Sequence, residues 1–130
     1  MKAKQKELAR FTDPIRAEFS NDGRSLTLLQ GFYYYRKGAQ ENRVEVPEGF
    51  ISDGFSNFGL HFVVKRYGRG LKCAILHDYL CEQAHAGKIS RKECDEIFLE
   101  AMLETRSFSP FKARVIYLGV RIYAKCKGYK

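Results

Sequence analysis

The stretch CAILHDYLC, residues 73–81, sets a histidine and an aspartate side by side within an apolar run. Apolar residues flank the pair on both sides within this stretch and predict a buried helix over about residues 71–86. Burying an ionisable pair such as His77 and Asp78 is costly unless each charge has a partner. A further carboxylate, Asp95, follows on the next predicted helix. The arrangement therefore indicates a functional site built on two consecutive helices.

The second helix begins at a capping box. Ser90-Arg91-Lys92-Glu93 places a serine before the helix and a glutamate three residues later, which predicts a helix to about Thr105. The short connection Gly87-Lys88-Ile89 makes the first two helices an antiparallel hairpin. A third helix is predicted after Ser109-Pro110, because proline is favoured at the first helical position, and it ends near Lys127-Gly128.

The residues before the helices predict β structure. Asn21-Asp22-Gly23 and Pro47-Glu48-Gly49 are turn signals, and residues 25–35 are rich in β-formers. The predicted fold class is α+β: a small N-terminal antiparallel β-sheet followed by a three-helix C-terminal half. One domain is expected over residues 1–130, with a charged flexible N-terminus at 1–10, a β-rich part at 11–51, a loop at 52–70 and a helical part at 71–127.

The composition limits the partners and the compartment. The formal net charge of +8 and the pI near 9.4 favour an acidic partner, namely anionic lipid, nucleic acid or an acidic host protein. No window of about 18 apolar residues predicts a transmembrane segment. Residues 1–10 lack the apolar core of a signal peptide. The four cysteines are therefore expected as free thiols in a reducing cytoplasm.

The side chains of the hairpin predict its chemistry. The Asp95 carboxylate accepts the proton-bearing ring nitrogen of His77, which leaves the other nitrogen to act as a general base toward water. Asp78 lies about 100° round the helix from His77. It is therefore expected to face the loop and to hold a hard cation there. The alternative is structural: a satisfied core histidine, and an Asp95 that pairs with Arg91 at i−4.

Three motifs resemble the phage and prophage family of domain of unknown function 1353 (DUF1353). They occur in the family's order: VPEGFISDGFS at 46–56, AILHDYL at 74–80, and SRKECDEIF at 90–98, with Ala101-Met102 after it. The resemblance spans about Phe11 to Tyr123 and implies a phage origin more than a function. The chain departs from the family at Asn57-Phe58-Gly59, where a proline and an arginine are usual.

His77, Asp78 and Asp95 are similar to the active-site hairpin of phospholipase A2. This resemblance implies a histidine base, an adjacent aspartate that holds calcium, and a distal aspartate that orients the histidine. It implies Asp53 as a second metal ligand. The irregular, glycine-rich stretch at 52–70 predicts the site wall, formed by Gly54, Ser56, Tyr67, Gly68 and Gly70. The enzymes carry a tyrosine where this chain has Cys81, and their calcium loop has a different spacing.

Zinc is the alternative metal. Cys73, His77, Cys81 and His85 recur every four residues on the first helix, and Cys94 lies near them in the hairpin. Sulfur and imidazole are ligands that zinc prefers. Calcium is favoured over zinc because the chain has no Cys-x-x-Cys knuckle and because cysteine is often buried for packing alone.

The C-terminal segment is basic. From residue 106 onward the chain has seven basic residues and no acidic one. Phe111, Val115, Leu118 and Ile122 recur at helical spacing and predict a helix that packs on the core through them, with a basic polar face. The alternative is a helix that binds DNA or lies on an anionic membrane.

The predicted function is that of a small bacteriophage-type protein with a metal-assisted, water-activating hydrolase site. His77 and Asp95 are the catalytic residues, Asp78 and Asp53 hold a divalent metal, and no organic cofactor is expected. The substrate is an ester or phosphodiester, a lipid being the most specific prediction. The alternative is a non-enzymatic virion or assembly protein, or an inhibitor of a host system. The expected location is the cytoplasm of the infected bacterial host, or the virion.

Overall fold

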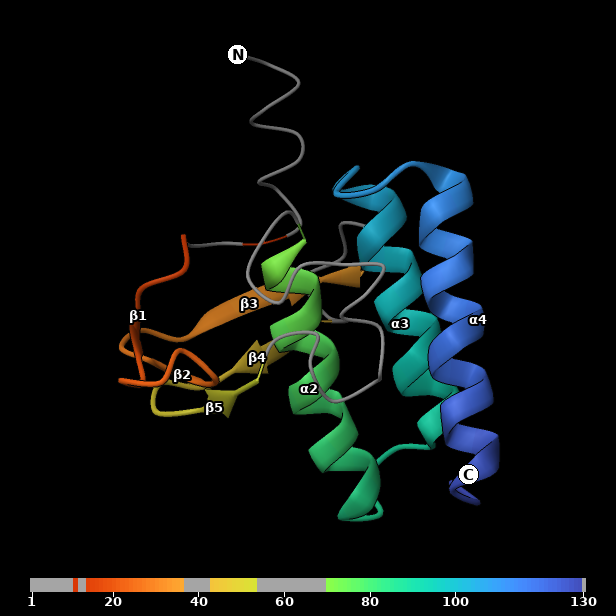
Figure 1. Cartoon of the computed structure of the whole chain (residues 1–130), viewed down its shortest axis with the longest axis horizontal. Coiled ribbons are helices and arrows are strands. Elements are labelled where there is room, and N and C mark those ends of the chain that lie inside the picture. The colour runs from red at the N-terminus through yellow and green to blue at the C-terminus, as the bar shows by residue number, and fades with distance from the viewer. Residues whose placement is uncertain (1–10, 12–13, 37–42, 54–69, 130) are drawn as a thin grey trace. The chain divides into compact units, whose positions relative to one another are not determined.

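The computed structural model describes residues 11, 14–36, 43–53 and 70–129 (Figure 1). The chain divides into two compact units, residues 1–52 and 53–130. The strands lie in the first unit and the helices in the second. This is the α+β class that the sequence predicts, with β structure first and three helices after it.

Among the residues of the first unit that the structure describes, five short strands form two antiparallel sheets. One sheet has the strand order β1-β2-β5, and the other pairs β3 with β4. In the first sheet Leu26 lies opposite Ser52, and in the second Phe32 lies opposite Val46. The strands are β1 Ala17–Phe19, β2 Leu26–Leu28, β3 Phe32–Tyr35, β4 Arg43–Val46 and β5 Ile51–Ser52.

The β-rich run of residues 25–35 is divided between the two sheets at Gly31. A Cβ atom at Gly31 would lie 2.7 Å from the carbonyl oxygen of Val46, so glycine allows the backbone to approach β4 closely. Within β3 the side chains alternate: Phe32 and Tyr34 are buried, and the residues between and after them are partly exposed. The run therefore supplies one buried face to each of two small sheets.

The described part of the second unit has three helices: α2 Leu71–His85, α3 Arg91–Glu104 and α4 Pro110–Cys126. The predicted cap at Ser90 is confirmed, since Ser90 Oγ accepts the Glu93 amide at 3.0 Å. Ser109 Oγ caps α4 in the same way, by accepting the Lys112 amide at 3.2 Å. Helix α3 packs against both α2 and α4, and α2 and α3 form the predicted antiparallel hairpin (Figure 1). Within the described ranges, none of the helices has the length and apolar character needed to cross a bilayer.

Gly70 precedes α2 in a left-handed conformation, with φ +85°. A Cβ atom there would lie 2.5 Å from Cε2 of the Phe108 ring. Gly87 is a matched control, because its φ is +81° and nothing lies within 4 Å of a Cβ atom. Alanine at either position would have to adopt the left-handed backbone conformation, which costs about 1–2 kcal/mol. Only Gly70→Ala adds overpacking, of about 1–3 kcal/mol.

We therefore expect Gly70→Ala to lower the thermal midpoint of the helical circular dichroism signal more than Gly87→Ala does. Equal midpoints for the two variants would show that Phe108 moves aside at no cost.

Candidate functional site

A buried hydrogen bond joins the two helices of the hairpin. His77 on α2 and Asp95 on α3 are both fully buried, and His77 Nε2 lies 2.6 Å from Asp95 Oδ1. An ionised carboxylate only accepts hydrogen bonds, so the ring donates its Nε2–H and keeps, when neutral, a lone pair on Nδ1. This is the contact across the hairpin that the sequence predicts. The catalytic roles assigned to the two residues stay predictions.

Asp95 is a junction of three helices. Its Oδ1 also accepts Arg91 Nε at 3.1 Å, and its Oδ2 accepts Arg121 Nη1 from α4 at 2.7 Å. Burial by itself raises the pKa of Asp95, but the hydrogen bonds from His77 and Arg121 and the charge of Arg91 outweigh it and hold the pKa below its ordinary value. Both sequence-based pairings of Asp95, with His77 and with Arg91, therefore occur together.

Arg121 was not predicted as part of this junction. It lies 26 residues after Asp95, and no local spacing connects the two. The signal that points to such a residue is physical: a fully buried carboxylate needs cations or hydrogen-bond donors on both of its oxygens.

The His77 ring is packed on an aromatic ring. The centroids of His77 and Phe98 are 4.3 Å apart and their planes differ by 21°. Burial alone lowers the pKa of His77, but the neighbouring Cys81 and Asp95 raise it overall. The stacking fixes the plane of the imidazole, and the bond to Asp95 fixes which nitrogen carries the proton.

Two thiols lie beside the same ring. Cys81 Sγ lies 3.9 Å from His77 Nδ1, 3.6 Å from Nε2 and 3.5 Å from Cys94 Sγ. Both are free cysteines. The hydrogen bond from Cys94 lowers the pKa of Cys81 to about 5, against the effect of burial and with the help of His77 and Arg91. The same bond, together with burial, raises the pKa of Cys94. Cys81 is thus the sulfur that is readily ionised.

His77, Cys81 and Cys94 form a group able to hold a metal ion, since one ligand atom from each lies within 4.8 Å of the others. Tetrahedral zinc binds sulfur at about 2.3 Å and nitrogen at about 2.0 Å, which puts two sulfurs about 3.8 Å apart and sulfur and nitrogen about 3.5 Å apart. The observed separations of 3.5 Å between the sulfurs and 3.9 Å from Cys81 Sγ to Nδ1 are close to those values.

Two members of the predicted cysteine and histidine stripe lie outside this group. Cys73 Sγ instead contacts the hydroxyls of Thr105 and Ser107, at 3.6 and 3.8 Å. Burial, partly offset by those two hydroxyls, raises the pKa of Cys73 to about 11. His85 is exposed and packs its ring against Tyr129, with centroids 4.7 Å apart.

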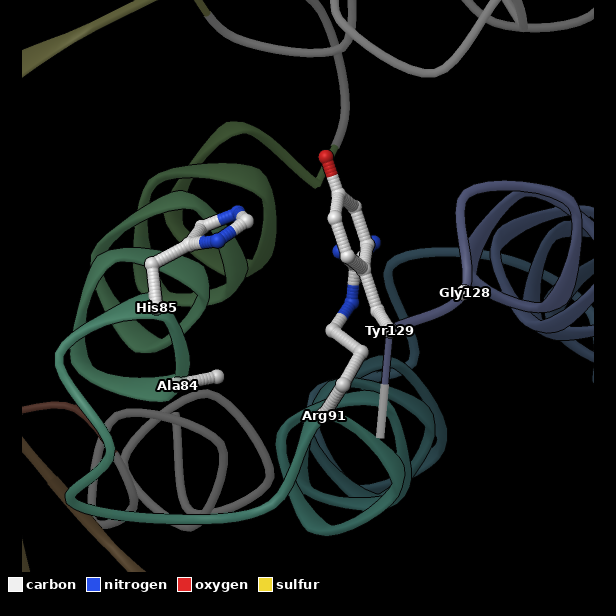
Figure 2. A pocket seen from close by; sticks show the side chains of 5 residues that line it. All are labelled: Ala84, His85, Arg91, Gly128 and Tyr129. Carbon is white, nitrogen blue, oxygen red and sulfur yellow. The ribbon is translucent and has the colours of Figure 1, made fainter.

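A pocket of about 260 Å³ opens beside Cys81. The other residues that line it are Asp78, Glu82, His85, Arg91, Tyr123 and Tyr129. Figure 2 shows the neighbouring pocket of about 230 Å³, where the side chains of His85, Arg91 and Tyr129 face one space. Cys81 is 8% exposed whereas His77 and Cys94 are wholly buried, so the group is reached from the pocket through Cys81.

Arg91 connects the pocket to the Asp95 junction. Its Nε is bound to Asp95, and its guanidinium carbon lies 5.2 Å from the centre of the Tyr129 ring. Among the described residues no hydrogen-bond partner is found for its buried Nη2. The Arg91 side chain thus lines the pocket and carries a buried amino group whose hydrogen bonds are not satisfied within the described part of the chain.

Asp78 and Asp53 are close to each other in the second unit. The backbone N–H of Asp53 donates to Asp78 Oδ2 at 3.2 Å. Asp78 is half-buried and has a different partner from His77, as the 100° offset between them predicts.

Of the predicted site wall, Gly70 precedes α2. The other wall residues, Gly54, Ser56, Tyr67 and Gly68, lie outside the described residues, so the calcium site stays a prediction.

The fold and the site together define an α+β protein whose helix hairpin holds a buried His-Asp pair and a His-Cys-Cys group. The chain matches the model of the family described as protein of unknown function (DUF1353) over residues 26–120, and it belongs to that family. The family assignment made from the three sequence motifs is thereby confirmed. No curated protein and no solved structure matches the chain.

Proposed function

We propose that this protein is a metal-assisted hydrolase in which His77, Cys81 and Cys94 bind zinc. The observation that carries the proposal is the clustering of their ligand atoms within 4.8 Å of one another, with Cys81 Sγ 3.5 Å from Cys94 Sγ and 3.9 Å from His77 Nδ1. His77 would bind through Nδ1, because Nε2 donates to Asp95. Histidines that bind metals commonly donate the other ring N–H to a carboxylate in this way.

Three protein ligands leave one position of tetrahedral zinc for water. A zinc ion held by these three residues would supply a water of lowered pKa as the nucleophile near neutral pH. Cys81 is the ligand at the pocket, and its lowered pKa makes the thiolate that zinc needs available. Asp95 then acts as the residue that orients His77, the role expected for it from the sequence.

The substrate is an ester or a phosphodiester that enters the pocket beside Cys81. Arg91 lines this pocket and favours an anionic group there, because guanidinium N–H groups bond strongly to phosphate or carboxylate oxygens. A phosphodiester carries that charge next to the bond to be cleaved. A phage protein acting in the infected host is the setting that this proposal assumes.

Calcium bound by Asp78 is the second candidate, with His77 acting as the base. The contact between the Asp53 backbone and the Asp78 carboxylate favours it, since it brings the two predicted metal-binding aspartates close together. The two candidates use His77 differently: as a zinc ligand through Nδ1, or as a proton acceptor at the same nitrogen.

Metal binding is the first test. We expect the full chain, reduced and stripped with EDTA, to take up one zinc ion. At 100 times its dissociation constant a ligand adds about 2.7 kcal/mol of stability, which raises the thermal midpoint by several degrees. Cys81→Ser and Cys94→Ser should lose this rise. Cys126→Ser is the matched control and should keep it, because Cys126 is exposed on α4. Bound Co²⁺ should show thiolate-to-metal absorption in the unmodified chain and in Cys126→Ser, but not in Cys81→Ser or Cys94→Ser.

The hydrolase step is tested on the zinc-loaded chain with model phosphodiesters and esters. Turnover that disappears in Cys94→Ser but persists in Cys126→Ser would support the proposal. A calcium-specific rise of the midpoint that Asp78→Asn removes would replace it with the second candidate. Binding of neither metal would leave the hairpin as a structural element and favour a virion, assembly or inhibitor role.

A further inference from the structure

We infer that the outward face of α4 docks on an anionic lipid surface. Four large apolar side chains form this face: Phe111 is 80% exposed, Val115 41%, Leu118 59% and Ile122 53%. We call these four residues the apolar stripe. The sequence predicts that they pack on the core, and that interpretation is wrong.

The opposite face of α4 is the one that packs. Ala113, Ile116, Val120 and Ala124 are fully buried there. At 100° per residue the apolar stripe occupies an arc of about 60°, centred about 175° from these residues. Helix α4 contacts α3 in the same unit (Figure 1). The apolar stripe is thus a second apolar face, separate from the one used for folding.

Basic residues border the apolar stripe. Arg114 and Lys125 are exposed and lie about 50–70° from its centre on one side. Lys112 lies on the other side, and no acidic residue follows Glu104 in the sequence. An apolar face bordered by lysine and arginine is the pattern of helices that lie in the interface of anionic membranes.

The charge also argues against a second copy of the chain on this face. Two basic helices brought together would place like charges side by side, and nothing acidic on α4 offsets them. Four side chains also cover less than the roughly 800 Å² per partner of a stable protein interface. Neither pocket beside the hairpin includes a residue of the apolar stripe, whereas a lipid surface needs only a convex apolar face.

Flotation of the full chain with vesicles tests the inference. We expect binding to phosphatidylcholine vesicles that contain phosphatidylglycerol, weak binding to phosphatidylcholine alone, and a decrease in affinity as salt rises. The double variant Phe111→Ser/Leu118→Ser should bind about 10-fold more weakly or worse, because two large apolar side chains no longer enter the lipid. Arg114→Gln/Lys125→Gln should weaken binding to the anionic vesicles and remove most of the preference for them.

Leu29→Ser is the matched control, since Leu29 is 55% exposed and lies outside α4. It should leave vesicle binding unchanged, and circular dichroism should show that all variants are folded. Cys94→Ser should also bind vesicles normally, so failure of the metal proposal and failure of this one are distinguishable.

Three results would overturn the inference. The first is equal binding by the apolar-stripe variant and the unmodified chain. The second is a dimer in solution that Phe111→Ser/Leu118→Ser dissociates, which would assign the face to a second copy. The third is binding of duplex DNA, but not of anionic vesicles, that depends on Arg114 and Lys125.

Discussion

Asp95→Ala is expected to lower the free energy of unfolding of the helical unit by about 3–5 kcal/mol. The carboxylate is fully buried and binds His77, Arg91 and Arg121. Its removal leaves Arg91 and Arg121 as cations without their shared anion, and a buried charge that loses its partner is costly. Denaturant unfolding followed by far-ultraviolet circular dichroism measures the loss, because all three described helices lie in this unit.

Glu96→Ala is the matched control, since Glu96 is the exposed neighbour of Asp95 on α3. It should change the stability by no more than about 0.5 kcal/mol. Equal effects of the two variants would contradict the junction described here. A large loss for Asp95→Ala does not by itself assign a catalytic role, so metal affinity is measured alongside in Asp95→Asn. If Asp95 orients a metal-binding His77, that affinity should fall about 10–100-fold.

The pH dependence of stability follows from the same residue. The pKa of Asp95 is lower in the folded protein than its ordinary value, so the stabilisation is present above that ordinary value of about 3.9. It is lost as the pH falls through the folded-state pKa. Asp95→Ala should therefore lose less of its free energy of unfolding on acidification than the unmodified chain does. The difference in unfolding free energy between the two proteins should narrow as the pH falls.

Phe98→Ala is expected to cost about 3–5 kcal/mol. Phe98 is fully buried and its ring stacks on His77. Its truncation removes apolar burial and leaves a cavity beside the imidazole. Phe111→Ala is the matched control: the same change on α4 at a residue that is 80% exposed should alter the stability by no more than about 0.5 kcal/mol.

The two phenylalanine variants are compared by chemical unfolding under the same conditions. A similar loss from both would mean that the apolar stripe is covered in solution, which would also count against the lipid-docking inference. A small loss from Phe98→Ala would mean that the hairpin closes over the vacated space.

The helices of the second unit were predictable because short local sequence signals mark where they begin. Ser90 and Pro110 mark where α3 and α4 begin, and both helices start within one residue of the predicted positions. The pairing of His77 with Asp95 was predictable for an energetic reason, since buried ionisable groups on adjacent helices of a hairpin need each other.

The choice between the two faces of α4 was not predictable from spacing. Helical periodicity shows which residues share a face, but α4 has two apolar faces. The one with Ala113, Ala124 and the branched Ile116 is buried and the one with Phe111 is exposed. Small side chains let helix axes approach closely, and this preference outweighs the larger apolar area of the other face in the observed packing.

The identity of the cysteines in the metal-capable group was likewise left open by the sequence. Cys73 and Cys81 are equally far from His77 along α2, so spacing does not distinguish them. The position of α3 does, because Cys94 reaches Cys81 and not Cys73. The role of Arg121 could not be predicted from the sequence for the same reason, because it depends on how α4 packs against α3.

The junction at Asp95 has a consequence for how the helical unit opens. One carboxylate holds side chains from α2, α3 and α4, so no single one of these helices can detach without breaking a buried charged contact. Local fluctuations that expose one helix alone are therefore penalised, and the three are tied into one cooperative unit. The His-Cys-Cys group lies inside that unit. Ligand atoms held in this way keep their spacing through thermal motion, which is the property a metal centre needs from its scaffold.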